Sequence, residues 1–165
     1  MKSLSISEKL KIIFLDFDGV LDTVFYDSYL ERHNQPSCDE SGRPVFDPLC
    51  VAYLNRIVES TDADIVVSSD WKYFDSLTDL REMWNQRNLP GQILDVTPNI
   101  RDIRGKEIAE WLQCHSDVTN YVIVDDLGAD NFYPEQLDSL VVVNPYCGID
   151  DSVCERTIKI LSRRY

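Results

Sequence analysis

Short apolar runs recur along the chain and indicate the strands of a parallel sheet. The clearest run covers residues 11–16, and others lie at 65–67, 121–124 and 140–143, with a weaker one at 92–96. Runs that are apolar throughout are typical of strands buried on both faces. The intervening stretches show helical periodicity, at 48–60, where Asp47 and Pro48 predict the helix start, and at 76–88, 105–115 and 151–163.

Strands that alternate with helices predict an α/β fold, a three-layer Rossmann-like open parallel sheet with helices on both faces. We expect residues 1–165 to form a single domain. Such sheets bind ligands beyond the carboxyl ends of their strands, near the point where the strand order reverses. A long irregular stretch at 23–46, within an insert at about 19–46, predicts a flap over that edge, with a disordered surface loop as the alternative.

Composition and charge narrow the classes of protein that fit. Hydrophobic residues make up 44% of the chain and charged residues 27%, which is a globular composition. The net charge of −13 opposes nonspecific adhesion to nucleic acid or to anionic membranes. Five cysteines without a C-x-x-C pair indicate neither a disulfide framework nor a zinc module. The first eleven residues lack the apolar segment of a signal peptide, and no run has membrane-spanning length, so we expect a cytoplasmic protein.

The acidic motif Asp16-Phe17-Asp18-Gly19-Val20-Leu21-Asp22 follows the first predicted strand directly. Unpaired charges at the end of a buried strand are costly, so a purely structural role is a poor explanation. One carboxylate can attack phosphorus while another manages the proton of the leaving group, and both can hold a divalent cation. The motif therefore favours phosphoryl transfer over its alternative, a turn rich in Asp and Gly.

Three further segments place suitable groups near the same sheet edge. The second strand ends in Ser68 and Ser69, and the strand at 121–124 ends in Asp125 and Asp126. Lys106, near the start of the helix before that strand, can neutralise a phosphate. Taken alone, these residues also fit a strand-end turn, a helix cap and a solvated lysine. Their order along the chain is what favours a phosphoryl-transfer site.

The sequence resembles the haloacid dehalogenase (HAD) superfamily of aspartate-nucleophile phosphatases from about residue 11 to 160. Its four motifs correspond to residues 16–21, Ser68, Lys106 and 125–126. Within that superfamily the chain is similar to the HAD domain of Swiss army knife RNA repair proteins, through residues 46–48, 67–72, 97–98, 104–108 and 124–126. It departs from that pattern at Lys72, where such domains often carry arginine.

The resemblance implies a role for each matched residue. Asp16 would be the nucleophile and Asp18 the general acid and base, while Ser68 and Lys106 would bind the phosphoryl group and offset its charge. It implies Mg²⁺ as the cofactor, held by the carboxylates of Asp16 and Asp126 and by the backbone carbonyl of Asp18. Asp125 would support these metal ligands without binding the metal itself. Substrate contacts are expected from Ser69, Gly19 and Lys72, with Arg101 and Arg104 as further candidates at the edge of the site.

These roles predict a Mg²⁺-dependent phosphatase that forms an aspartyl-phosphate intermediate. No large cap fits between Lys106 and Asp125, and residues 19–46 hold little more than a flap, so the site is nearly capless. An open site favours a phosphate on a macromolecule, either a phosphoprotein (phosphotyrosine included) or a nucleic-acid end, although the negative charge weakens the second. The alternatives are a small metabolite or nucleotide phosphatase and a catalytically silent binding or regulatory module.

Overall fold

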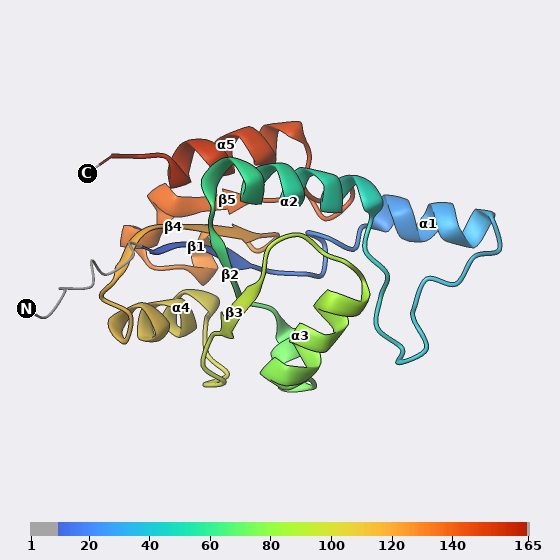
Figure 1. Ribbon diagram of the computed structural model, residues 1–165, viewed down its shortest axis with the longest axis horizontal. Coiled ribbons are helices and arrows are strands. Elements are labelled where there is room, and N and C mark those ends of the chain that lie inside the picture. Colours follow the sequence, from blue (N-terminus) through green and yellow to red (C-terminus); the bar gives the residue numbers. More distant parts are fainter. Residues whose placement is uncertain (1–9, 165) are drawn as a thin grey trace, which may run out of the picture.

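The computed structural model describes residues 10–164, which contain five strands and five α-helices (Figure 1). The strands are β1 (Leu10–Leu15), β2 (Asp64–Val67), β3 (Ile93–Val96), β4 (Val118–Asp125) and β5 (Leu140–Val142). The helices are α1 (Val24–Arg32), α2 (Pro48–Thr61), α3 (Leu77–Gln86), α4 (Arg104–Gln113) and α5 (Asp151–Leu161). The five predicted strands and the four predicted helices are confirmed, with bounds that differ by a few residues.

The five strands form one parallel sheet in the order β3-β2-β1-β4-β5. Leu15 at the end of β1 is aligned with Val67 of β2 on one side and with Val124 of β4 on the other. The chain starts in the middle of the sheet, proceeds to the β3 edge and then crosses back to β4. The strand order therefore reverses at β1, and a ligand site is expected beyond the ends of β1 and β4.

Helices cover both faces of the sheet, as predicted. Ile13 and Leu15 of β1 belong to the core cluster that includes residues of α2 and α5, whereas Ile12 and Phe14 belong to the cluster on the α4 side. In Figure 1, α2 and α5 lie together above the sheet and α4 lies below it. Successive residues of a strand point to opposite faces, so an entirely apolar β1 is buried from both sides.

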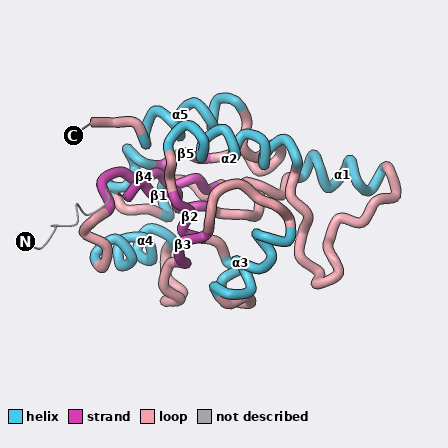
Figure 2. The backbone as a smooth tube through the Cα atoms, in the orientation of Figure 1, coloured by secondary structure: helices cyan, strands magenta, loops and turns pink. Residues whose placement is uncertain are grey.

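The segment at 23–46 is more regular than predicted. Its first part forms helix α1, and a long loop follows, which Figure 2 shows at one end of the sheet, outside the helix layers. Only Leu30 of α1 is buried, so this helix has no apolar stripe through which a periodic pattern could reveal it. The expectation of an irregular stretch is therefore wrong for residues 24–32, and its role as a flap stays a prediction.

Polar contacts hold this segment against the rest of the molecule. Arg43 pairs with Asp75 at 2.7 Å, and Arg87, which caps the end of α3, pairs with Asp39 at 2.7 Å. The N-cap residue of α1, Thr23, donates from Oγ1 to the carboxylate of Asp47 over 3.0 Å. Asp47 is itself the predicted N-cap of α2. Both ends of the segment are thus attached to neighbouring parts of the main fold.

No helix among residues 10–164 combines the length and the apolar character that a membrane span requires. The prediction about a signal peptide concerns the first eleven residues, most of which lie outside the described part of the chain.

Candidate active site

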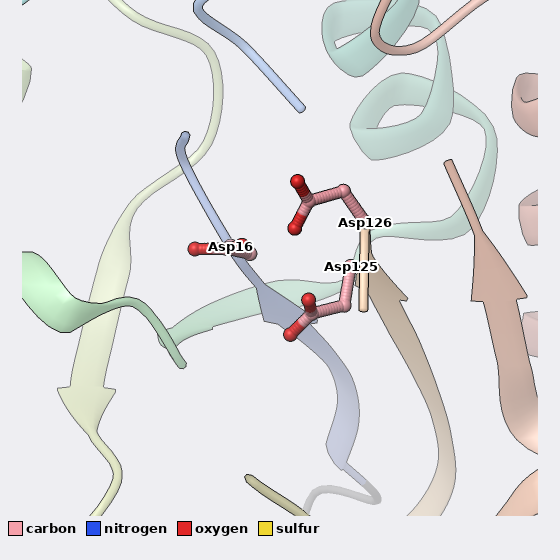
Figure 3. A group of neighbouring side chains, drawn as sticks. All are labelled: Asp16, Asp125 and Asp126. Carbon is pink, nitrogen blue, oxygen red and sulfur yellow. The ribbon is translucent and has the colours of Figure 1, made fainter. Parts of the chain in front are cut away.

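Three aspartates meet beyond the carboxyl ends of β1 and β4. Asp16 follows β1, Asp125 is the last residue of β4, and Asp126 comes next. One carboxylate oxygen from each lies within 4.8 Å of the others, and Figure 3 shows the three side chains gathered between the two strand ends. Because Leu15 is aligned with Val124, the residues that follow them must emerge side by side. The predicted convergence of these acids is therefore a consequence of the sheet register.

The carboxyl groups of Asp16 and Asp125 are buried, with 4% and 0% of each residue exposed. Burial, together with the nearby Asp125 carboxylate, raises the pKa of Asp16 to about 9. Burial also raises the pKa of Asp125 to about 6, although Arg104 opposes this shift. Negative charges crowded in a desolvated space favour protonation or a bound cation. The site therefore favours the addition of positive charge, either as a proton or as a bound cation.

Arg104, the first residue of α4, is the cation that contacts this cluster. Its Nε lies 3.4 Å from Oδ2 of Asp125, and its guanidinium also donates to the backbone carbonyl of Ser68. Only 8% of Arg104 is exposed. Its positive charge lowers the pKa of both Asp16 and Asp125 relative to what burial alone would produce. Arg104 thus joins the ends of β2 and β4 at the level of the proposed nucleophile.

Lys106 does not reach the cluster. Its ammonium pairs with Asp102 at 2.8 Å on the outside of α4, where the side chains of both residues are 42% exposed. The predicted neutralising role at the phosphoryl site therefore does not agree with the position of Lys106, and the cation in contact with Asp125 is Arg104. The physical reason is that residues two positions apart on a helix point to different sides.

Lys72 is also not placed for the predicted contact with substrate. Its side chain is 1% exposed, and its ammonium donates to Thr97 Oγ1 over 2.7 Å and pairs with the buried Glu107. Tyr73 donates to the other oxygen of Glu107 over 2.9 Å. Lys72 therefore joins the segment after β2 to α4, the helix that carries Arg104. Arg101, the other candidate at the edge, lies over the ring of Tyr73 at 5.6 Å.

The two serines after β2 lie in the same buried space. Ser68 and Ser69 are both 0% exposed. The hydroxyl of Ser69 bonds to Asp16 and lowers the pKa of that carboxyl. Oγ of Ser68 has no hydrogen-bond partner in the described part of the chain, although buried hydroxyls rarely lack one. Ser68 therefore offers a free hydroxyl at the place where a phosphoryl oxygen was predicted.

Asp18 is held by two neighbours to which the sequence analysis gave no role. The indole Nε1 of Trp71 donates to Oδ1 of Asp18 over 2.9 Å. Burial, together with a hydrogen bond to Asp18, raises the pKa of Asp22 to about 8. Asp22 and Trp71 both belong to motifs found in the sequence. The contact of Trp71 with Asp18, however, arises only from the tertiary fold. Asp18 itself is exposed.

Gly19 has a conformation and surroundings that suit only glycine. Its φ angle is 74°, and its N–H donates to Oδ1 of Asp22 over 2.8 Å, so this amide is engaged within the turn. A Cβ at this position would lie 2.6 Å from Oδ2 of Asp126 and 2.8 Å from Cβ of Pro145. The glycine therefore makes room for the Asp126 carboxylate, and its predicted contact with substrate stays a prediction.

Gly19→Ala is expected to weaken Mg²⁺ binding by about tenfold or more, the effect typical of displaced ligand supports. Gly42→Ala is a matched control, because Gly42 has a φ angle of 78° but no atom within 4 Å of its would-be Cβ. Both variants carry the same backbone strain, and only one has the clash with Asp126. Isothermal titration calorimetry with Mg²⁺ compares them, and equal affinities would contradict the role assigned to Gly19.

A cavity of about 360 Å³ opens beside Asp18 and Asp126. Helix α1 and the loop at 37–45 form its outer wall, and Pro145 from the loop after β5 forms another part. Backbone bonds from Val24 N to Pro145 O (3.2 Å) and from Phe25 N to Tyr146 O (3.0 Å) hold α1 against that loop. The predicted insert at 19–46 therefore borders the site.

A parallel sheet with aspartates at the carboxyl ends of β1 and β4 is the arrangement expected of a hydrolase of the HAD type. A comparison with protein families supports this class directly. The chain belongs to the family described as the HAD domain in Swiss Army Knife RNA repair proteins, which matches residues 12–154. The resemblance inferred from the motifs is thereby confirmed. Searches of curated proteins and of solved structures gave no significant match.

Proposed function

We propose that the protein is a Mg²⁺-dependent phosphatase that hydrolyses phosphomonoesters through an aspartyl phosphate on Asp16. The observation that carries this proposal is the convergence of three carboxylates within 4.8 Å, beside a buried arginine and two buried serines. Family membership supports a hydrolase of this class. Nothing in the buried surroundings of Asp16 gives three clustered acids a packing role.

The donor set suits Mg²⁺. Carboxylate and carbonyl oxygens are the ligands that this cation takes in proteins. Asp16 and Asp126 would hold it through their carboxylates and Asp18 through its backbone carbonyl, while Asp125, paired with Arg104, would orient the cluster. The raised pKa values of Asp16 and Asp125 agree with a site built for added positive charge. Bound Mg²⁺ would polarise a phosphoryl oxygen and offset the negative charge of the ester.

The residues of the chain would share the two half-reactions. Asp16 attacks phosphorus, the bond from phosphorus to the leaving oxygen breaks, and Asp18 gives that oxygen a proton. Water then attacks the phosphorus of the aspartyl phosphate, Asp18 takes the proton of that water, and the bond to Asp16 breaks to release inorganic phosphate. Ser68 and the backbone N–H of Ser69 would hold the phosphoryl oxygens. Arg104 would stabilise the charge that develops on them.

The leading substrate is a phosphomonoester at a nucleic-acid end, because the matching family is described by its place in RNA repair proteins. A phosphoprotein remains a second candidate, since the net charge of −13 opposes the approach of a polyanion. Both candidates agree with a cavity that no cap domain covers in the described part of the chain.

Phosphate release from 4-nitrophenyl phosphate, with Mg²⁺ and with EDTA, tests the proposed reaction. We expect turnover only with Mg²⁺. A panel of 3′- and 5′-phosphorylated oligonucleotides, phosphotyrosine peptides and sugar phosphates then ranks the substrate classes. Absence of Mg²⁺-dependent turnover on every substrate would contradict the phosphatase and would favour a binding module on the same fold.

A further inference from the structure

The cavity beside the catalytic aspartates has an acidic and apolar wall. Its lining contains the four carboxyl groups of Asp18, Asp22, Asp27 and Asp126, and none of the described residues that line it is a lysine or an arginine. Two of these acids, Asp18 and Asp126, belong to the proposed catalytic machinery. The other two face the space that lies beyond it.

Two arginines at the loop that borders the cavity are engaged with other groups. Arg43 lies in the loop that borders the cavity, but its guanidinium makes two bonds to Asp75, at 2.7 and 3.1 Å. Arg87 donates to Asp39 and to the carbonyl of Pro44, over 2.7 and 2.8 Å. Arg43 and Arg87 therefore hold the loop in place, and neither side chain lines the cavity.

Of the four acids that line the cavity, Asp27 is the one whose carboxylate has neither a proposed catalytic role nor a bonding partner among the residues that the structure describes. It lies in the first turn of α1, and no hydrogen bond or ion pair of its carboxylate exists within residues 10–164. Its apolar neighbours in the lining are Val24, Leu30 and Val45. A carboxylate beside apolar side chains attracts a cation, tolerates a neutral group and repels an anion, over a range of about 8 Å at physiological ionic strength.

We infer that this cavity receives the organic part of the phosphomonoester, and that Asp27 makes the enzyme select neutral or cationic leaving groups over anionic ones. The inference rests on the proposed function, because a leaving group is positioned here only if phosphate binds at Asp16. It narrows the substrate to monoesters without a second anionic group near the phosphate. A nucleic-acid end fits only if its terminal nucleoside fills the cavity and the next phosphodiester lies outside.

A charge series of aryl phosphates with similar leaving groups tests this selection. The substrates are the 3-(aminomethyl)-, 3-(hydroxymethyl)- and 3-(carboxymethyl)phenyl phosphates, assayed by release of inorganic phosphate with Mg²⁺. For the wild-type protein we expect kcat/KM to be roughly three- to tenfold lower for the carboxymethyl than for the hydroxymethyl compound, with the aminomethyl compound equal or better. Asp27→Lys is expected to remove or reverse this order.

Glu59→Lys is the matched control, because it changes the net charge equally on an exposed position of α2 that does not line the cavity. It should preserve the wild-type order. Circular dichroism verifies that both variants are folded. Equal kcat/KM values for the three substrates in the wild-type protein, or an unchanged order in folded Asp27→Lys, would overturn the inference while leaving the phosphatase intact. Absence of turnover on all three would overturn the proposed function and the inference with it.

Discussion

Replacing Asp16 by asparagine is expected to lower phosphate release by at least ~10³-fold, because the amide cannot form the phospho-enzyme. The carboxylate is the proposed nucleophile, and no other described carboxylate lies in its position at the end of β1. Asparagine has nearly the same shape, so the fold should not change. Steady-state assays with 4-nitrophenyl phosphate and Mg²⁺ measure the loss.

The same substitution is expected to stabilise the metal-free protein. The pKa of Asp16 is about 9 in the folded chain, against an ordinary value of 3.8, chiefly because the group is buried. Between these two values the unfolded chain has lost the proton that the folded chain keeps. The free energy of unfolding therefore falls as pH rises from about 4 to about 9. Asparagine does not ionise and so removes this pH-dependent loss. The gain in the free energy of unfolding should therefore be larger at pH 8 than at pH 5.

Thermal melting in EDTA at both pH values measures this gain. Each kcal/mol gained corresponds to a rise in Tm of about 2–4 °C for a chain of this size. Asp130→Asn, an exposed position in the short helix Ala129–Asn131, is the control and should change neither activity nor Tm. A drop in the Tm of metal-free Asp16→Asn at pH 8 would contradict the interpretation that the carboxylate is placed for chemistry at a cost in stability.

The sheet could be predicted from sequence because each of its strands is apolar throughout and lies between helical segments. The register then dictates that Asp16 and Asp125 meet, since both follow aligned residues of adjacent strands. Helix α1 could not be predicted in the same way. It buries only Leu30, and its exposed positions include Phe25 and Tyr29, so neither apolar nor polar residues repeat with the helix. Its place is determined by contacts with distant loops.

Helix periodicity explains why Arg104, and not Lys106, lies beside the aspartate cluster. The resemblance assigned the neutralising role to Lys106 by motif position. The buried face of α4 carries Ile108 and Trp111, and Arg104 lies four and seven residues before them, on the same face. Lys106 lies two residues farther along, on the exposed side. Periodicity therefore contained the signal for Arg104, whereas the pairing of Trp71 with Asp18 depends on tertiary structure alone.

Exchanging each cation of α4 for methionine separates these two assignments. Arg104→Met is expected to lower kcat/KM by about 10²-fold, since it removes the charge beside the phosphoryl site. Lys106→Met is expected to stay within about twofold of the wild type, because its ammonium pairs only with the exposed Asp102 and exposed pairs contribute little. Assays on 4-nitrophenyl phosphate with Mg²⁺ compare the two variants. The reverse order of effects would restore the role that motif position gave to Lys106.

Thermal stability distinguishes a loss of catalysis from a loss of folding in Arg104→Met. Removing one partner of a buried ion pair costs about 3–5 kcal/mol, because the other charge stays buried without compensation. Arg104→Met alone should therefore lower the Tm of the metal-free protein by roughly 6 °C or more. Adding Asp125→Asn neutralises the orphaned carboxylate and should recover most of that loss. If the double variant regains its Tm but is less active than Asp125→Asn alone, the arginine acts on the reaction as well as on the fold. Activity equal to that of Asp125→Asn alone would reduce Arg104 to a structural partner of Asp125.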